Sequence, residues 1–364
     1  MSSRVIFHID FDYFYAQCEE LRNPELKAKP VAVCVFSDRG GDSGAIATAN
    51  YLARKYGIKS GMPIKFAKRK VENIPDAVFL PTDFDYYSEV SEETMNVIRE
   101  YADIFEYIGR DEAYLDVTKK TNGDFTNSLH LAQQLKNAIR ASTKLSSTIG
   151  ISSNKLVSKI ASGFKKPDGL TLVEPEKIEV FLDPLPINVI PGIGKKTEER
   201  FSESGLSTVA QLKSLDVFTL NEMFGRKIGS YIYNAARGID EEPVSPRHDP
   251  IQYSRIVTLK QDSKDLDFLS RDIEKLCKDV HEAIAKDNLG FKSVGIQFVQ
   301  TDLSNKTKSR TLKNSTSSLD EIIKTSLQLL RESLEDQKLL VRRLGVKVSD
   351  LSQVTGQMDL TNYF

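Results

Sequence analysis

The hydrophobic residues of the chain follow two periodicities, that of buried strands and that of amphipathic helices. Residues 5–11 and 31–36 are short apolar runs that predict buried strands. Residues 13–22 have helical spacing, and residues 45–57 predict a helix that ends at Gly57. The first part of the chain therefore combines strands with helices.

The mixture of strands and helices continues to about residue 174. Its further expected elements are a helix near 87–101, a strand hairpin over 104–117, a helix over 127–141, a strand over 147–151 and a helix over 154–162. Such a mixture indicates one α/β core with an inserted helical lobe. Residues 175–240 then change to short helices and glycines without convincing strands.

The last third of the chain predicts a separate module. Residues 241–250 contain three prolines and are typical of a linker. Beyond the linker we expect the split ferredoxin-like β-α-β-β-α-β order, with a strand over 251–260, a helix over 265–287, strands over 291–300 and 306–312, a helix over 317–337 and a strand over 341–349. Residues 350–364 hold too little apolar material for a core and predict a flexible tail.

Composition limits the class of protein. A length of 364 residues suggests two or three domains, and 40% hydrophobic with 28% charged residues is typical of globular proteins. No apolar run approaches the ~18 residues that a membrane span needs, and Asp10 comes too early for a signal peptide. The three scattered cysteines favour neither a zinc site nor a disulfide framework. We therefore expect a protein of the reducing cytoplasm, or of the nucleus in a eukaryote.

Charge is divided unevenly along the chain. Residues 251–349 hold 18 Lys and Arg against 14 Asp and Glu, a net charge of +4, whereas the whole chain carries −1. This asymmetry suggests a basic module attached to an acidic one. A solvated surface is the simpler explanation of the same charges.

Carboxylates occupy two of the apolar strands. Asp10 ends the first strand, and Asp111 and Glu112 lie inside the hairpin over 104–117. Buried carboxylates are costly unless they are paired or bound to metal, and several from neighbouring strands could hold two divalent ions for phosphoryl transfer. Alternatively, an Asp-Glu pair in a hairpin is a solvated turn.

Five ordered motifs resolve this choice. The runs at 10–17 (DFDYFYAQ), 47–54 (ATANYLAR), 111–116 (DEAYLD), 150–155 (GISSNK) and 166–169 (KPDG) resemble those of the Y-family DNA polymerases. These are translesion enzymes of the polymerase IV type, and the chain is most similar to their archaeal members. The resemblance covers essentially the whole chain, in order and with near-family spacing.

The resemblance implies an error-prone, template-directed DNA polymerase without a proofreading exonuclease. Its expected right-hand architecture is a palm (1–13 and 81–174), fingers (14–80), a small helical thumb (175–240), a linker (241–250), a ferredoxin-like little finger (251–349) and the tail. Its expected substrates are primer-template DNA and deoxynucleoside triphosphates, and we expect a monomer.

The resemblance also implies roles for particular residues. Two Mg²⁺ ions, for which Mn²⁺ could substitute, would be bound by Asp10, Asp111, Glu112 and the main-chain carbonyl of Phe11. Tyr15 would be the steric gate against a ribose 2′-hydroxyl. The triphosphate would contact Tyr13, Thr48, Tyr51, Arg54 and Lys166, whose cations and hydroxyls suit phosphate oxygens. For Tyr51 and Arg54, three residues apart, an ordinary helix face is the alternative.

One motif departs from the family. Ser-Ile usually precedes the Asp-Glu pair, whereas this chain has Gly109-Arg110. On a strand Arg110 would point opposite to Asp111, toward the triphosphate lobe or solvent. The departure leaves the metal assignment in place but puts the packing of the hairpin in doubt.

Three further segments suggest how DNA and a partner would be bound. Gly192, Gly194 and Lys195 belong to a run that resembles a helix-hairpin-helix, which binds phosphate through backbone N–H groups, and 224–229 resembles a degenerate second one. Two sets of basic residues at period-two spacing each predict a basic sheet face for phosphates, namely Lys306, Lys308 and Arg310, and Arg343 and Lys347. The alternatives are a glycine helix cap and a solvated sheet face. The tail residues Gln357, Leu360, Tyr363 and Phe364 resemble the peptide that docks on the PCNA sliding clamp.

Two other functions have to be separated from the polymerase. A nucleotide cyclase also uses paired carboxylates on palm strands, but it needs neither the hairpin nor the basic module. A clamp-tethered DNA-binding scaffold without catalysis is the non-enzymatic alternative. Intact Asp10, Asp111 and Glu112 argue against the scaffold, and Gly109-Arg110 is its only support.

Overall fold

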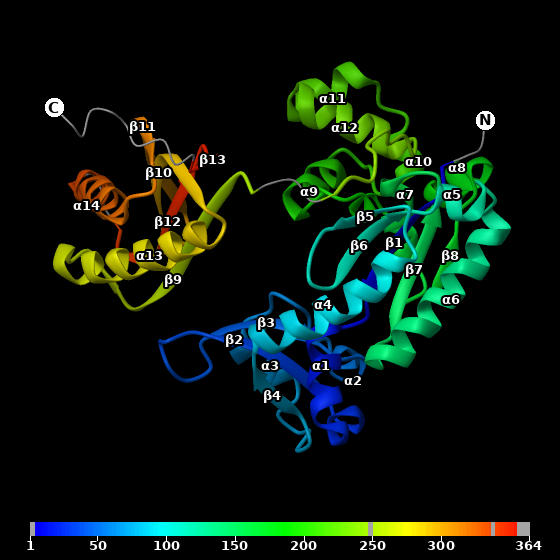
Figure 1. The fold of residues 1–364 in the computed structure, drawn as a ribbon, viewed down its shortest axis with the longest axis horizontal. Coiled ribbons are helices and arrows are strands. Elements are labelled where there is room, and N and C mark those ends of the chain that lie inside the picture. Colours follow the sequence, from blue (N-terminus) through cyan, green and yellow to red (C-terminus); the bar gives the residue numbers. More distant parts are fainter. Residues whose placement is uncertain (1–3, 247–249, 336–338, 355–364) are drawn as a thin grey trace. The chain divides into compact units, whose positions relative to one another are not determined.

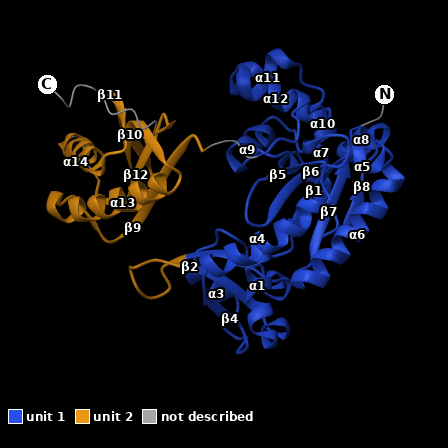
Figure 2. Cartoon of the chain, viewed as in Figure 1, with its two compact units in different colours: residues 1–35, 45–248 blue, residues 36–44, 249–364 orange. Residues whose placement is uncertain are grey.

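The computed structural model of the chain describes residues 4–246, 250–335 and 339–354. Contacts divide it into two compact units, one of residues 1–35 and 45–248 and the other of residues 36–44 and 249–364 (Figure 2). Each unit has hydrophobic clusters of its own, so each can be understood from its own packing.

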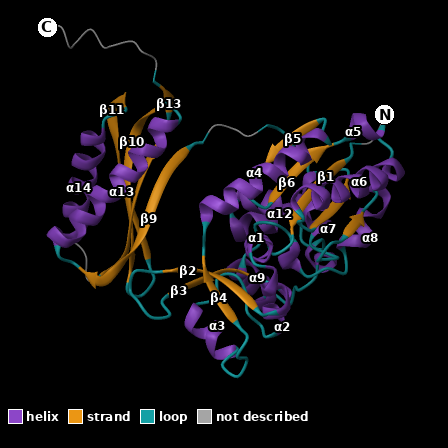
Figure 3. Cartoon of the chain, turned by 60° about the horizontal axis from the view of Figure 1, so that its bottom comes forward, coloured by secondary structure: helices purple, strands orange, loops and turns teal. Residues whose placement is uncertain are grey.

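A five-stranded sheet forms the centre of the first unit (Figures 1 and 3). Its strands, in spatial order, are β5 (Ile104–Tyr107), β6 (Glu112–Asp116), β1 (Ile6–Phe11), β7 (Ser147–Ser152) and β8 (Leu170–Leu172). Strand β1 is antiparallel to both of its neighbours and lies in the middle. The sequence predicted the four longer strands, including the hairpin of β5 and β6.

The two faces of this sheet are covered by different helices. Phe7, Ile9 and Phe11 pack into the cluster that includes apolar residues of α4 (Phe84–Glu100) and α6 (Phe125–Thr143). The alternate residues of β1 face the other way, because side chains alternate along a strand. Helix α7 crosses that other face.

The crossing of α7 (Lys155–Ser162) over the sheet is close. Gly150 on β7 pairs with His8 on β1, and a Cβ placed at Gly150 would lie 2.0 Å from the carbonyl oxygen of Ser158. Only glycine permits this approach. Helix α7 therefore lies directly over the face that carries His8 and Asp10.

A smaller three-stranded sheet, in the order β3-β2-β4, is formed by the segment between β1 and β5. It comprises β2 (Val31–Phe36), β3 (Gly44–Ala49) and β4 (Val78–Pro81), and two short helices follow β3, namely α2 (Tyr51–Lys55) and α3 (Ile64–Lys70). The predicted helix over 45–57 is wrong, because its first half is β3. Asn50 ends the strand: its side-chain oxygen accepts from the backbone N–H groups of Val31 and Ala53, which joins β2 to the first turn of α2.

The remaining helices of the first unit are short. They are α1 (Phe14–Arg22), α5 (Thr118–Thr121), α8 (Ile178–Leu182), α9 (Lys195–Glu203), α10 (Val209–Leu212), α11 (Val217–Phe224) and α12 (Arg226–Ala236), with 3-10 turns η1 (Pro24–Ala28), η2 (Pro175–Lys177) and η3 (Ile187–Val189). The helices between 178 and 236 share one hydrophobic cluster. The prediction of a helical segment over 175–240 is therefore confirmed.

The described part of the predicted linker is packed rather than free. Val244 is buried with Ile6 and Tyr114 of the central sheet, and the Glu242 carboxylate forms an ion pair of 2.9 Å with Lys155. Residues 241–246 therefore belong structurally to the first unit.

The second unit is an antiparallel sheet with two helices. In chain order it comprises β9 (Gln252–Ser263), α13 (Leu266–Lys286), β10 (Leu289–Gln300), β11 (Asn305–Thr316), α14 (Leu319–Glu335) and β12 (Val341–Ser349), which confirms the predicted β-α-β-β-α-β order. The strands lie in the order β11-β10-β12-β9, and both helices contribute to one cluster with the sheet. No helix within the described residues is long and apolar enough to cross a membrane.

Two segments join this unit unexpectedly. Residues 36–44 belong to it through Arg39, whose Nε donates to the carbonyl oxygen of Leu259 at 2.8 Å and whose guanidinium pairs with Asp262. The predicted tail begins with a short strand, β13 (Ser352–Gln353), which pairs with Leu289 and Gly290. The four predicted clamp-binding residues, Gln357, Leu360, Tyr363 and Phe364, lie outside the described residues.

Candidate active site

A cleft of about 340 Å³ opens at the end of β1. Its lining brings together most of the residues that the sequence predicted for catalysis and nucleotide binding. These are Asp10, Phe11, Tyr13, Tyr15, Thr48, Arg54, Asp111 and Lys166, joined by Phe14, Ala47 and Ser60. Of the predicted set, Glu112 and Tyr51 are absent from this lining.

Asp10 and Asp111 are the two acidic side chains of the cleft. Burial raises the pKa of Asp10, which the ion pair with Lys166 opposes. Asp111 is exposed at the rim, yet the protein around it removes enough water to raise its pKa, and the charge of Glu112 adds to the rise. The charged form of each carboxylate is therefore disfavoured, and a nearby cation would stabilise it.

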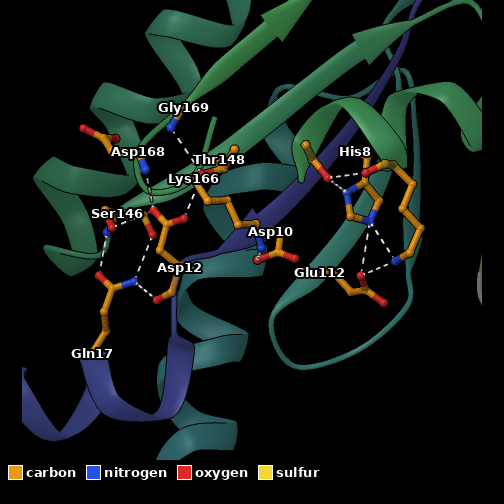
Figure 4. A network of polar contacts seen from close by, with 12 residues as sticks. His8, Asp10, Asp12, Gln17, Glu112, Ser146, Thr148, Lys166, Asp168 and Gly169 are labelled. Carbon is orange, nitrogen blue, oxygen red and sulfur yellow. Dashed lines mark hydrogen bonds and ion pairs between the residues drawn. The ribbon is translucent and has the colours of Figure 1, made fainter. Parts of the chain in front are cut away.

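Glu112 faces a different set of partners (Figure 4). Its Oε2 lies 3.2 Å from Nε2 of His8 and forms an ion pair with Lys159 of α7. The hydrogen bond with His8 and the charge of Lys159 lower the pKa of Glu112 to about 2. Within the described residues no group of three His, Cys, Asp or Glu side chains is arranged around a metal position, which fits the displacement of Glu112 from the two aspartates.

His8 is a buried link between Glu112 and α7. Its Nδ1 lies 2.7 Å from the hydroxyl of Ser162. Because a carboxylate only accepts, a direct hydrogen bond from His8 to Glu112 needs the proton on Nε2, whereas the ammonium of Lys159, 3.3 Å from Nε2, would donate to the other tautomer. The Ser162 hydroxyl donates to the carbonyl oxygen of Lys159 at 2.8 Å, so its oxygen can accept from Nδ1. Burial lowers the pKa of His8, which favours the neutral ring.

Asp12 organises the opposite side of the site and is fully buried (Figure 4). Its carboxylate accepts from the hydroxyls of Ser146 and Thr148, at 2.8 and 2.7 Å, and from the backbone N–H of Asp168 at 2.8 Å. Three hydrogen-bond donors thus stabilise a carboxylate that is buried away from water. The contact with Asp168 anchors the loop that carries Lys166, so Asp12 indirectly places the cation beside Asp10.

Aromatic rings surround Tyr15. It stacks on Tyr87 with ring centroids 4.6 Å apart, and the edge of Phe84 lies 5.9 Å away. Arg110 turns toward the same group: its Nε donates to the hydroxyl of Ser88 at 2.8 Å, and its guanidinium lies over Phe84. Interaction with Arg110 opposes the rise that burial causes in the pKa of Tyr15. Arg110 is exposed to solvent, which was one of its two expected directions, and its contact with α4 was not expected.

Tyr51 lies beside the cleft rather than in it. It lines a neighbouring pocket of about 470 Å³ and meets Tyr13 edge to face, with ring centroids 5.2 Å apart. Its buried hydroxyl has no hydrogen-bond partner in the part of the chain that the structure describes, and the Arg54 guanidinium lies 4.9 Å from the centre of its ring. Tyr13 lines both pockets, so the two tyrosines form the wall between them.

The predicted hairpin in the helical segment has suitable backbone geometry. Gly192 has a positive φ of 87°, which favours glycine, and Gly194 is the N-cap of α9, whose first residue is Lys195. A Cβ at Gly194 would meet nothing within 4 Å, so its backbone is open to approach. Gly225 caps α12 in a similar way with a φ of 82°.

The two predicted basic sets of the second unit lie on opposite faces of its sheet. Lys306, Lys308 and Arg310 pair across the ladder with Phe298, Ile296 and Val294, which are core residues, so they share the face that the helices cover. Lys308 and Arg310 form ion pairs with Glu332 of α14, at 2.9 and 2.7 Å. Arg343 and Lys347 alternate with the buried Leu344 and Val346 and therefore face the other way.

Comparison with known proteins identifies the family. The impB/mucB/samB family matches residues 9–163, the thumb domain of DNA polymerase-iota matches 188–240, and the impB/mucB/samB C-terminal domain matches 250–360. DNA polymerase IV of Nitrosopumilus maritimus is 67% identical over the full length of both chains. A Y-family DNA polymerase chimera of known structure is 35% identical, with a TM-score of 0.88 over 96% of this chain and 99% of that one.

The chain belongs to the Y family of DNA polymerases. This Y-family polymerase is also 37% identical to DNA polymerase IV of Saccharolobus solfataricus, over 97% of this chain and 98% of the relative. The insertion ternary complex of Dbh DNA polymerase is 34% identical, with a TM-score of 0.68 over 96% of this chain and 99% of that one. The predictions of family, fold class and a DNA-directed DNA polymerase are confirmed.

Sequence reasoning about this polymerase missed several residues of the site, among them His8, Asp12, Lys159 and Ser60. The sequence did contain an indication for His8, because a polar residue two positions before Asp10 on a strand lies on the same face as Asp10. Asp12 carried a weaker one, as a carboxylate directly after an apolar run. Lys159 and Ser60 had none, since their positions depend on how α7 and the loop before α3 pack.

The contacts of Asp12 predict a graded loss of stability. Asp12→Ala leaves one buried and two partly buried donors without their acceptor and should lower the free energy of unfolding by about 3 kcal/mol. Asp12→Asn should cost less, because its amide oxygen still accepts and the Thr148 hydroxyl can rotate to accept from the new N–H₂ group. Urea unfolding would measure both, with the exposed Asp85→Ala as the control. Equal stability of Asp12→Ala and the control would contradict this account.

Proposed function

We propose that this polymerase adds deoxynucleotides to a primer 3′ end by two-metal-ion nucleotidyl transfer and bypasses damaged template bases. The observation that carries the proposal is the placement of Asp10 and Asp111 in one cleft with Lys166, Arg54 and Thr48. Two acidic groups and two cations around one space suit a magnesium-bound triphosphate. Primer-template DNA and a nucleotide are the substrates of such an enzyme.

The residues present fit a pair of divalent ions. Carboxylate and carbonyl oxygens are the ligands that Mg²⁺ prefers, and Asp10, Asp111 and the Phe11 carbonyl supply them, with Glu112 within reach on the strand beside Asp10. The raised pKa values of the two aspartates indicate groups that a cation would stabilise. When bound, the ions would activate the primer hydroxyl and neutralise charge on the phosphates.

The other cleft residues would bind and select the nucleotide. Lys166 and Arg54 would neutralise the triphosphate, and the buried Thr48 would orient it by a hydrogen bond. Tyr15, held against Tyr87, would fill the space of a ribose 2′-hydroxyl and so exclude ribonucleotides by a clash. Tyr51 would steady the guanidinium of Arg54 on which its ring packs.

We assign the four parts of the hand as the sequence analysis proposed. The cluster around the five-stranded sheet would be the palm, the cluster of β2, β3 and β4 the fingers, and the helical cluster the thumb. The second unit would be the little finger. Glycines 192 and 194, with Lys195, would bind a backbone phosphate in the thumb.

Recruitment and fidelity complete the proposal. A PCNA-type sliding clamp would bind the tail through Gln357, Leu360, Tyr363 and Phe364; this part of the proposal rests on their sequence pattern alone. Each part of the chain already has a role in polymerisation, so no segment is assigned to proofreading. A monomer is the expected state.

Primer extension by an active-site variant tests the catalytic assignment. Asp111→Ala should lower the rate of single-nucleotide incorporation in Mg²⁺ by at least about 100-fold, because the variant loses a ligand that stabilises charge in the transition state. Its affinity for primer-template DNA should stay within about threefold of wild type, since Asp111 would contact the ions and not the duplex. Near-wild-type extension would refute the active-site assignment.

The two basic sets provide a matched test of DNA binding. Arg343→Ala with Lys347→Ala removes charge from the open face of the sheet, whereas Lys308→Ala with Arg310→Ala removes charge that Glu332 already neutralises in part. The first pair should reduce the slope of log affinity against log salt by about 2, and the second pair by clearly less. Fluorescence anisotropy with a labelled primer-template measures both slopes. A larger effect of the second pair would place DNA on the other face.

A further inference from the structure

Glu112 stands where it can reach two different sites. In the ladder between β1 and β6 it pairs directly with Asp10, and His8 lies two residues before Asp10 on the same face. The Cβ atoms of directly opposed residues are ~5 Å apart, and a diagonal neighbour is within reach of a long side chain. Rotation of the Glu112 side chain alone can therefore carry its carboxylate from His8 to Asp10.

The structure holds this carboxylate at His8. One oxygen, Oε2, receives both contacts, with Nε2 of His8 at 3.2 Å and with the ammonium of Lys159. The side chain of Glu112 is 25% exposed and that of His8 is 1% exposed, so the acid is the mobile partner and the histidine the fixed one.

The cradle that holds Glu112 is rigid. Helix α7 cannot move away from the sheet without losing its close packing at Gly150, and it carries both Lys159 and Ser162. Ser162 fixes the ring of His8 by the 2.7 Å hydrogen bond to Nδ1. The positions of the two groups that bind Glu112 are therefore set by the fold rather than by the substrate.

Charge explains why the carboxylate rests there. Lys166 pairs with Asp10 at the cleft, and Asp111 lies beside them as a second anion. A third carboxylate in that cleft would set three anions against the two cations of the lining, Lys166 and Arg54, and so add repulsion that they do not offset. A bound divalent cation reverses this balance, because it attracts all three.

We propose that His8 and Lys159 are positioning residues that hold Glu112 apart from Asp10 and Asp111 until a divalent cation draws it into the cleft. The proposal rests on the proposed metal site. Lys159 competes with the incoming ion for the same carboxylate, so the cradle lowers the affinity of the free protein for the ion. The polymerase thereby completes its ligand set only when the ion arrives.

Binding of Mn²⁺ to the full-length protein tests this competition without measuring catalysis. Free Mn²⁺ is followed by its electron paramagnetic resonance signal during a titration. Lys159→Met, which keeps the aliphatic stem, should lower the dissociation constant by about fivefold, the size expected for loss of a partly exposed ion pair. His8→Phe, which preserves the ring volume, should lower it in the same direction, so the test does not depend on one variant.

Two controls separate the cradle from a general charge effect. Lys165→Met removes an equal charge from an exposed position nearby and should leave Mn²⁺ binding unchanged. Glu112→Gln combined with Lys159→Met should lose the gain of Lys159→Met alone, because the freed carboxylate is its source. Thermal melting of each variant establishes that it is folded.

The outcomes distinguish this inference from the function on which it rests. If Asp111→Asn weakens Mn²⁺ binding but folded Lys159→Met and His8→Phe bind the ion no more tightly than wild type, the cradle is refuted and the metal site stands. If Asp111→Asn leaves Mn²⁺ binding unchanged, the metal site itself fails.

Discussion

A carboxylate that is deprived of water must be stabilised by something else, and two such groups lie at the end of strand β1, Asp10 within the strand and Asp12 just after it. The fold stabilises them differently. Asp12 receives three neutral donors and needs nothing further. Among the described residues Asp10 forms an ion pair with Lys166 alone, beside a second acid, Asp111, and so remains receptive to a cation. The same loop after α7 serves both, through the N–H of Asp168 and the ammonium of Lys166, so the structural carboxylate positions the reactive one.

Much of the fold could be predicted from periodicity, and the failures have local causes. The order of strands and helices in the second unit follows from clean alternation of period two and period 3.6, and it is confirmed. The prediction of a helix over 45–57 failed because alanine occurs in both helices and strands. The strand ends at Asn50, whose side chain bonds to a segment 19 residues away in the sequence. The basic residues of β11 were placed on a face correctly as a set, but only the ladder with β10 reveals that the face is the one covered by α14.

The residues of the site likewise divide into those that the sequence could predict and those that it could not. A charged residue at the end of an apolar strand drew attention to Asp10, because burial of a carboxylate is costly. Asp111, which is exposed and lies just before β6, was assigned by the resemblance to the family motif. The direction of Glu112 could not be predicted, since it depends on Lys159, which reaches it only through the packing of α7 at Gly150. Arg110 was recognised as unusual, but its contacts with Ser88 and Phe84 depend on how α4 lies against the hairpin.

The central claim is that desolvation leaves Asp10 and Asp111 in need of a cation, and carboxyl ¹³C NMR of the metal-free protein tests it most directly. With Asp and Glu labelled and the signals assigned by Asp10→Asn, Asp111→Asn and Glu112→Gln, the pKa of each group can be read from its titration. The account predicts pKa values for both aspartates above the ordinary 3.8, which fall when Mg²⁺ is added, and a pKa for Glu112 below 4.5 without Mg²⁺. Aspartate pKa values at or below 3.8 that Mg²⁺ does not change would contradict it.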